Sequence, residues 1–248
     1  LAFKIRSGVI GGLSPKQRIT ENLIASVGSA EHRDIARDAV RRSLVLLKND
    51  GVLPIPSNSR LAVLGSGSDS LMMQTGGWTL SWQGSGNTND DFPGATSILS
   101  AFERALKPNG VTVVRDPSDA SIEAAVVVFG EMPYAEGQGD VSSLEFKSNE
   151  NEDLQLLKFF QQKNIPVVGL FLTGRPMWTN RELNASDAFV VAWLPGTEGD
   201  GIADVLIGDP NGSPRYDFTG RLPFSWPSNS LNADDYELPV NEYLFTRG

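Results

Sequence analysis

The sequence predicts an α/β fold, with a mostly parallel sheet of about six strands and helices on both faces (an α/β sandwich). Short apolar runs alternate with segments of helical spacing from residue 60 to residue 208. The run AAVVVF at residues 124–129 is apolar at every position, which is typical of a strand buried on both faces of a parallel sheet. This alternation favours βαβ units joined by right-handed crossovers.

Each element is expected from a local pattern. Strands are predicted at residues 60–64, 111–114, 124–129, 166–172 and 188–194, and a short edge segment at 218–226. Helices are predicted at residues 30–49, 94–106, 150–163 and 201–207. The helix at 30–49 is expected because apolar residues recur at helical spacing from Ile35 to Leu47, before Asp50 and Gly51 interrupt the pattern. Pro223 restricts its segment to a sheet edge.

The pattern divides the chain into three parts. Residues 1–29 are expected to be a linker from a missing upstream domain, because glycines and Pro15 interrupt a weak periodicity. Residues 30–228 form the α/β sandwich domain, and residues 229–248 a C-terminal tail. The first residue is Leu1 rather than methionine, so we expect a piece of a longer polypeptide.

Composition excludes several classes of function. The net charge is −9 and the basic residues are scattered, which argues against nucleic acid and membrane surfaces as partners. The chain has no cysteine and a single histidine, His32, so thiolate and multi-histidine metal sites are excluded. No metal or cofactor is expected. No apolar run approaches the roughly 20 residues that a membrane-spanning helix needs.

The candidate functional residues lie in two loops that follow strands. Glu131 and Glu136 lie in the loop after the strand at 124–129, and Trp78 and Trp82 lie in the glycine-rich loop 72–89. Ligands of parallel sheets bind beyond the carboxyl ends of the strands. A flat indole stacks on the apolar face of a sugar ring, and glycosidases use Asp or Glu side chains as acid, base and nucleophile. The two loops therefore indicate a carbohydrate site.

Two other functions remain open at this point. The run GSGSDS at residues 65–70 follows a predicted strand and suggests nucleotide binding, although the third glycine of the dinucleotide motif is missing. A non-catalytic carbohydrate-binding or interface module would also use exposed tryptophans.

Four runs together resemble the second domain of glycoside hydrolase family 3, the β-glucosidases and exo-acting β-glucan glucohydrolases. They are HRDIARDAVRRSLVLLKNDGVLPI, QTGGWTLSWQG, VVAWLPGTEGDGIADVLIGD and FTGRLPFSWP, between residues 32 and 227. The resemblance implies a six-stranded α/β sandwich that lends an acid/base carboxylate to a (β/α)8 barrel. By motif position it implies that Glu136 is the acid/base catalyst, that Trp82 stacks on the sugar in the leaving-group subsite, and that Trp78 supports it.

The same resemblance implies a retaining hydrolase whose nucleophile lies in the barrel, outside this chain. The expected partners are β-glucan oligosaccharides with 1,3- and 1,4-linkages, or other glucosides, and that barrel. The fragment alone is expected to be inactive, and the location secreted or periplasmic. In the complete enzyme, burial and the nucleophile's charge would raise the pKa of Glu136, whereas an open pocket should largely remove that shift.

Neighbouring residues of the same types are expected to have structural roles. Glu131 directly follows its strand and is expected to brace the loop by hydrogen bonds. Glu198 and Asp200 are expected to cap the helix at 201–207, since acidic side chains favour helix N-termini. Trp193 and Trp226 are expected in packing roles.

Overall fold

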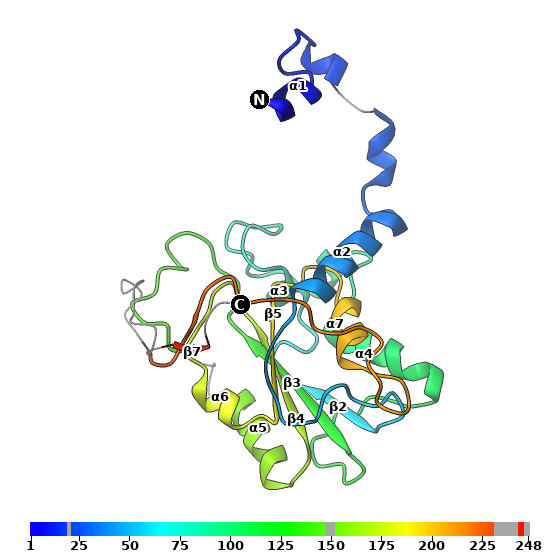
Figure 1. Cartoon of the computed structure of the whole chain (residues 1–248), viewed down its shortest axis with the longest axis vertical. Coiled ribbons are helices and arrows are strands. Elements are labelled where there is room, and N and C mark those ends of the chain that lie inside the picture. Colours follow the sequence, from blue (N-terminus) through cyan, green and yellow to red (C-terminus); the bar gives the residue numbers. More distant parts are fainter. Residues whose placement is uncertain (19–20, 147–151, 231–242, 246–248) are drawn as a thin grey trace. The chain divides into compact units, whose positions relative to one another are not determined.

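The computed structural model describes residues 1–18, 21–146, 152–230 and 243–245 (Figure 1). It contains two compact units, Leu1–Ala36 and Arg37–Gly248. Helix α2, Ala30–Ser43, begins in the first unit and ends in the second. None of the helices in the described ranges has the length and hydropathy needed to traverse a bilayer.

The first unit exposes much of its apolar surface. It contains α1 (Ala2–Arg6), the short 3-10 helices η1 (Pro15–Arg18) and η2 (Glu21–Ser26), and the start of α2. Its exposed large apolar side chains are Leu1, Phe3, Ile5, Val9, Ile10, Leu13, Leu23, Ile24, Val27 and Ile35. Apolar surface of this extent is typical of an interaction site.

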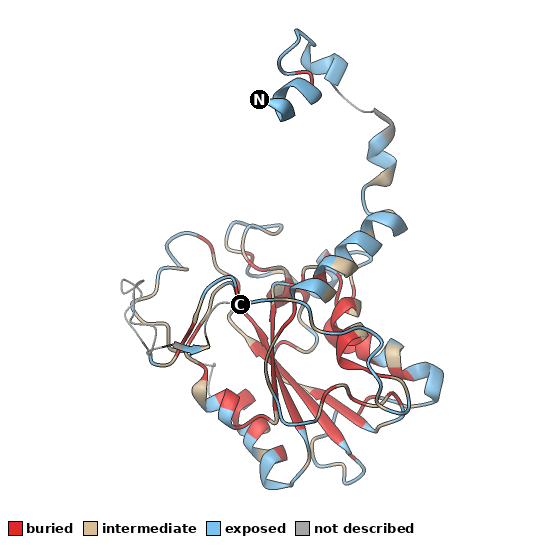
Figure 2. Ribbon diagram, in the orientation of Figure 1, coloured by how far each residue is buried: buried red, intermediate tan, exposed pale blue. Residues whose placement is uncertain are grey.

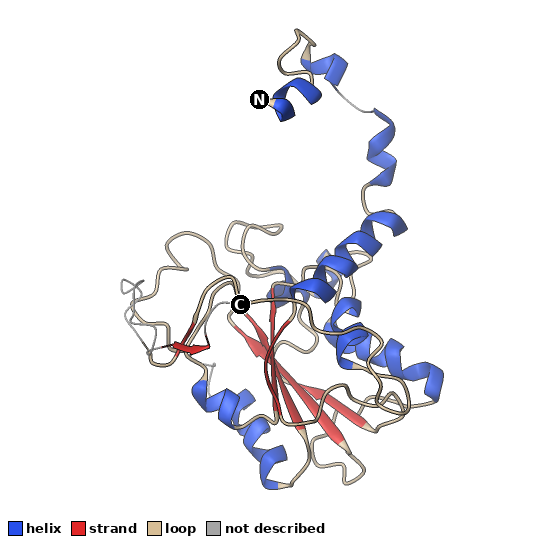
Figure 3. Cartoon of the chain, viewed as in Figure 1, coloured by secondary structure: helices blue, strands red, loops and turns tan. Residues whose placement is uncertain are grey.

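The second unit is built on a five-stranded sheet (Figure 3). The strand order is β1-β5-β4-β3-β2, with bounds Val45–Asn49, Ala188–Trp193, Val167–Leu172, Ala124–Gly130 and Leu61–Leu64. The strands β2, β3, β4 and β5 are parallel to one another, and β1 pairs with β5 antiparallel. The mostly parallel α/β fold is therefore confirmed.

Helices cover both faces of the sheet (Figure 1). The helices α4 (Ile98–Leu106) and α7 (Asp200–Leu206) pack on one face, and α5 (Glu152–Gln162) and α6 (Asn180–Asn184) on the other. Successive residues of β3 enter the two cores in turn, since side chains alternate along a strand. Figure 2 shows the buried strands at the centre of the unit.

Shorter elements connect these layers. They are α3 (Leu71–Thr75), the 3-10 helices η3 (Asn89–Asp91) and η4 (Lys107–Asn109), and a two-stranded sheet of β6 (Trp226–Pro227) and β7 (Tyr243–Phe245). Trp226 is fully buried, as expected of a packing residue. Regular pairing in the predicted segment 218–226 is confined to this last residue.

The predicted helix at residues 30–49 is wrong in its second half. Helix α2 ends at Ser43, and residues 45–49 form β1 instead. Leu44 is buried in one core and Val45 in the other, the alternation between two faces that is typical of a strand. Residues Val45 and Leu46 then pair with Val191 and Val190 of β5. Tertiary pairing therefore overrides a local pattern that was compatible with a helix.

The predicted strand at residues 111–114 is reduced to an isolated bridge between Val114 and Ala62. The sheet consequently has five strands rather than about six. The bridge shows the path of the chain, because Val114 lies on one side of β2 and β3 lies on the other. After β2 the chain passes to one side at Val114 and then returns to the other side to form β3, so the strand order reverses between β2 and β3. Open α/β sheets bind ligands where the strand order reverses, beyond the carboxyl ends of the strands.

Candidate active site

The loop after β3, residues 131–140, is braced by Glu131. Arg175 donates to Oε1 of Glu131 at 2.7 and 3.0 Å, and the hydroxyl of Thr173 donates to Oε2 at 2.7 Å. The Arg175 guanidinium also lies 4.3 Å from the ring centroid of Tyr134 and donates to the carbonyl of Gly139 at 2.7 Å. Glu131 therefore has the bracing role expected from its position, and its carboxylate is committed to a partly buried ion pair.

Tyr134 is held in the same network. Its hydroxyl donates to Oε2 of Glu131 at 3.2 Å. Burial, together with the nearby charge of Glu131, raises the pKa of Tyr134 to about 12. Tyr134 is consequently a neutral hydrogen-bond donor at physiological pH.

The loop 72–89, which bears Trp78 and Trp82 and is called the tryptophan loop below, starts within α3, where Gln74 holds it in place. The side chain of Gln74 is fully buried, donates to the carbonyl of Gly196 at 3.1 Å and accepts from the amide of Ile98 at 2.9 Å. The amide of Trp78 then donates to the carbonyl of Trp82 at 2.9 Å, which closes a short turn. Trp78 adopts a left-handed backbone conformation with φ of 60°. Such a conformation costs a non-glycine residue free energy and is often found at functional sites.

The two loops are packed against each other. A Cβ atom added to Gly77 would lie 1.9 Å from the carbonyl oxygen of Tyr134, so only glycine permits this approach. The side chain of Gln83 accepts from the amide of Ala135 at 2.6 Å and donates to the carbonyl of Glu136 at 3.2 Å. The backbone beside Glu136 is therefore attached to the tryptophan loop.

The three candidate residues meet where these loops join. The indole N–H of Trp82 donates to Oε2 of Glu136 at 2.6 Å, and that of Trp78 approaches Oε1 at 3.3 Å. The two rings have centroids 6.3 Å apart, and their residues are 69% (Trp78) and 55% (Trp82) exposed. Two exposed indoles therefore donate to the two oxygens of one carboxylate.

These contacts lower the pKa of Glu136 below its ordinary value. The largest cause is the hydrogen bond from Trp82, followed by its own backbone amide, with a smaller contribution from Trp78. Hydrogen bonds to the charged form stabilise it, so the carboxyl is ionised at neutral pH in this open site.

The run GSGSDS forms a loop that is occupied by a protein carboxylate. The amide and hydroxyl of Ser66 donate to the buried Asp153 at 2.8 and 2.7 Å. A nucleotide phosphate would have to compete with this negative charge for the same amide. The contact argues against nucleotide binding at this loop.

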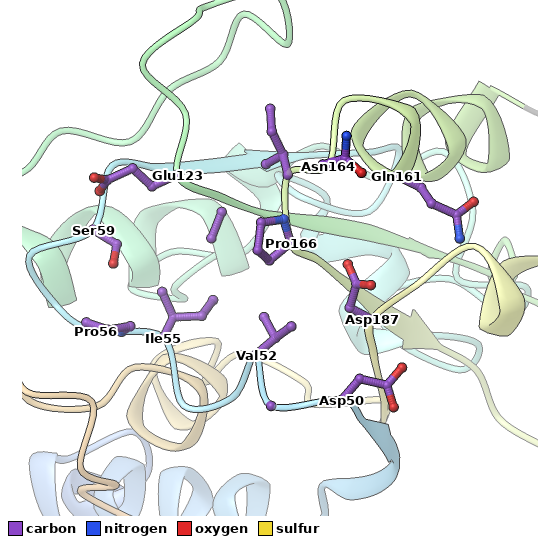
Figure 4. A pocket seen from close by; sticks show the side chains of 13 residues that line it. Asp50, Val52, Ile55, Pro56, Ser59, Glu123, Gln161, Asn164, Pro166 and Asp187 are labelled. Carbon is purple, nitrogen blue, oxygen red and sulfur yellow. The ribbon is translucent and has the colours of Figure 1, made fainter.

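A separate cavity of about 550 Å³ lies at the opposite, amino edge of the sheet (Figure 4). Glu123 and Asp187 line it, next to the first residues of β3 and β5. Their carboxylates accept from the backbone amides of Arg60 and Val167, each at 2.8 Å. These two carboxylates therefore have a structural role at the starts of the strands, at the edge of the sheet opposite to that of Glu136.

The N-cap of α7 is Gly199, so Asp200 lies in the first turn, where negative charge is favourable, rather than at the predicted cap. Asp200 begins α7 and forms an ion pair with Arg104 at 3.2 Å, while Glu198 is buried just before that helix. Trp193 is partly buried at the end of β5, and its indole donates to the carbonyl of Ser43 at 3.1 Å.

A family model for the glycosyl hydrolase family 3 C-terminal domain matches residues 44–248. The chain belongs to this family. In this family 3 domain, the two joined loops lie at the carboxyl edge of the sheet.

Curated relatives of the family 3 domain include β-glucosidases. It is 32% identical to the lysosomal β-glucosidase of Dictyostelium discoideum, over 84% of this chain and 27% of that protein. It is 29% identical to the periplasmic β-glucosidase of Salmonella typhimurium, over 92% of this chain and 32% of that protein. The chain therefore spans about a third of the length of these relatives.

Solved structures of other proteins share its fold. The exo-1,3/1,4-β-glucanase from a Pseudoalteromonas species matches with a TM-score of 0.87 and 47% identity, over 99% of this chain and 31% of that one. A β-glucosidase from Listeria innocua matches with a TM-score of 0.69 at 23% identity, over 99% of this chain and 37% of that one, which shows likeness of fold alone.

The sequence pattern indicates no role for two residues of the site, Gln83 and Arg175. Each side chain bonds to a loop that is far away in the sequence, as in the bond from Arg175 to Glu131. A local sequence pattern cannot indicate a partner that is distant in the sequence. The one available signal is that both residues lie in loops that follow strands of the parallel sheet.

Proposed function

We propose that this chain is the acid/base-donating domain of a retaining, exo-acting β-glucosidase or β-glucan glucohydrolase. The substrate would be the terminal β-D-glucosyl residue of 1,3- and 1,4-linked oligosaccharides. The observation that carries this proposal is the position of the Glu136 carboxylate between the exposed indoles of Trp78 and Trp82. The names of the relatives, several β-glucosidases and an exo-1,3/1,4-β-glucanase, support the substrate class.

In the first step, protonated Glu136 donates its proton to the glycosidic oxygen while a nucleophilic carboxylate attacks the anomeric carbon. In the second step, ionised Glu136 accepts a proton from the water that releases glucose. The nucleophile of a retaining enzyme lies about 5–5.5 Å from the acid/base carboxylate. Glu131, the other carboxylate of the loop, is committed to Arg175. As the resemblance to glycoside hydrolase family 3 implies, we place the nucleophile in a barrel domain outside this chain.

The pKa of Glu136 must rise before it can act as an acid. Its two indole donors hold it ionised in the open site. A bound sugar would displace water, and a nearby nucleophile carboxylate would add negative charge, and both effects favour the protonated form. Trp82 would contribute its ring face to the sugar of the leaving group, with Trp78 supporting it.

The exposed apolar side chains of Leu1–Ala36 support a larger assembly. We propose that residues 1–29 link the domain to the barrel, that residues 30–228 form the sandwich domain, and that residues 229–248 form a tail. The isolated chain is then inactive. We propose a secreted or periplasmic location, which the name of the periplasmic relative supports, and the relative named as lysosomal also supports a location outside the cytosol.

The test is Glu136→Gln in the complete polypeptide that carries this chain and its upstream domain. The turnover of oligosaccharides should fall by about 100- to 10,000-fold, the usual contribution of general acid catalysis. Glucosides with activated aryl leaving groups should lose less in the glycosylation step, because they need no proton. With Glu136→Ala, azide should restore turnover on such activated substrates by forming glucosyl azide. Unchanged turnover of oligosaccharides would refute the assignment.

A non-catalytic carbohydrate-binding module is the second candidate, favoured by the exposure of Trp78 and Trp82. It predicts that Glu136→Gln leaves turnover unchanged and that Trp82→Ala weakens sugar binding by the isolated chain. The same pair of variants therefore separates the two functions.

A further inference from the structure

The loop that bears Glu136 has few backbone anchors. At its start, the amide of Glu131 donates to the carbonyl of Leu172 at 3.0 Å, and near its end Arg175 holds the carbonyl of Gly139. Between these points, the amide of Ala135 and the carbonyl of Glu136 are both bonded to the side chain of Gln83. The Glu136 side chain itself is exposed, and among the described residues its hydrogen bonds are made through its carboxylate oxygens.

Gln83 has a geometry suited to this attachment. Its amide group presents one acceptor and one donor, and the backbone of residues 135–136 offers one N–H and one C=O in return. The paired bonds resemble those between two strands, so they constrain the orientation of the loop as well as its distance. Ala135 is nearly buried, which shields its bond from water.

The neighbour of Gln83 along the chain is Trp82, whose indole donates to the Glu136 carboxylate. The dipeptide Trp82-Gln83 therefore holds Glu136 at both its backbone and its side chain. Displacement of the Glu136 backbone would change the distance between the carboxylate and the face of the indole. In the proposed reaction, that distance decides whether the acid reaches the oxygen of a sugar bound on the ring.

We propose that Gln83 is a positioning residue for Glu136, keeping the acid/base carboxylate and the Trp82 ring in one fixed arrangement. This inference rests on the proposed function for its catalytic consequence, but the attachment itself can be measured independently. Two experiments separate these parts.

The first experiment measures amide hydrogen exchange in the 248-residue chain. Gln83→Met keeps the length of the side chain and removes both hydrogen bonds. The Ala135 amide should then exchange about tenfold faster, which corresponds to one ordinary hydrogen bond. Gln138→Met is the matched control, because Gln138 is exposed in the same loop and takes part in no hydrogen bond among the described residues. An unchanged Ala135 rate in Gln83→Met overturns the inference.

The second experiment measures kcat and KM in the complete polypeptide with two substrates. Gln83→Met should lower kcat/KM, which reports the glycosylation step, by about 10- to 100-fold on an oligosaccharide, the range expected when a catalytic group is displaced by about 1 Å. The loss in kcat/KM should be below about threefold on a dinitrophenyl glucoside, whose leaving group needs no proton. Equal losses on both substrates would indicate a general structural defect and overturn the positioning role.

Glu136→Gln serves as the reference for the proposed function. If this variant shows no dependence on the leaving group, the acid/base assignment fails, and the catalytic part of the inference fails with it. The exchange rate of Ala135 still decides the attachment of the loops. Failure of the inference and failure of the proposed function are therefore distinguishable.

Discussion

The close approach of the two loops at Gly77 allows a quantitative prediction. A Cβ atom at this position would lie 1.9 Å from the carbonyl oxygen of Tyr134. A carbon–oxygen contact needs about 3.3 Å, so Gly77→Ala must separate the loops by about 1.4 Å. The opposing atom is backbone, so the strain cannot be relieved by a change of rotamer. The tryptophan loop and the loop after β3 (residues 131–140) should therefore move apart.

The separation should be visible at Glu136 before any activity is measured. The hydrogen bonds from Trp78 and Trp82 to its carboxylate should weaken, and their indole N–H resonances should shift upfield in NMR spectra of the chain. In the complete polypeptide, a displacement above about 1 Å should lower kcat on oligosaccharides by about 100-fold.

Gly86→Ala is the matched control in the same loop. Gly86 has φ of 78° and no atom within 4 Å of an added Cβ, so the substitution strains the backbone without forcing the loops apart. It should destabilise the domain by about 1 kcal/mol and leave the indole resonances in place. If Gly77→Ala and Gly86→Ala give the same spectra at Trp78 and Trp82, the steric reasoning is refuted.

Two further predictions concern the ionisation of carboxyl groups. Glu182 is 1% exposed, its carboxylate oxygens have no partner among the described residues, and burial raises its pKa. Ionising it costs stability as pH rises through that pKa, so Glu182→Gln should stabilise the domain by about 1 to 3 kcal/mol at pH 7. The gain should vanish near pH 4 in urea denaturation; an equal gain at both pH values contradicts this. Trp82→Phe removes the indole donor, so the pKa of Glu136 should rise towards its ordinary value in an NMR titration, and an unmoved midpoint speaks against that hydrogen bond.

The sequence predicts the layered fold because buried parallel strands are apolar without interruption, as at residues 124–130. The prediction of a helix is wrong at residues 45–49, because their apolar pattern is compatible with either a helix or a strand. The choice is made by pairing with β5, whose residues lie more than a hundred positions away. The prediction of a strand at 111–114 is wrong for a related reason, since in this segment only Val114 pairs with a residue of the sheet.

The candidate site is partly predictable for the same physical reason. The carboxyl ends of β2 and β3 lie side by side in a parallel sheet, so loops that follow them are expected to meet. That expectation brings Trp78, Trp82 and Glu136 together. It does not indicate that both indoles donate to the carboxylate or that the pKa of Glu136 consequently falls. Those features depend on side-chain directions that a sequence pattern does not encode.

The most direct test of the central claim is one distance in a crystal structure of the complete polypeptide with a glucose-configured inhibitor. We predict that the Glu136 carboxylate lies about 5–5.5 Å from a second carboxylate of the upstream domain, on opposite sides of the anomeric carbon. A structure in which Glu136 points away from the sugar, with a different carboxyl group next to the glycosidic oxygen, would contradict it.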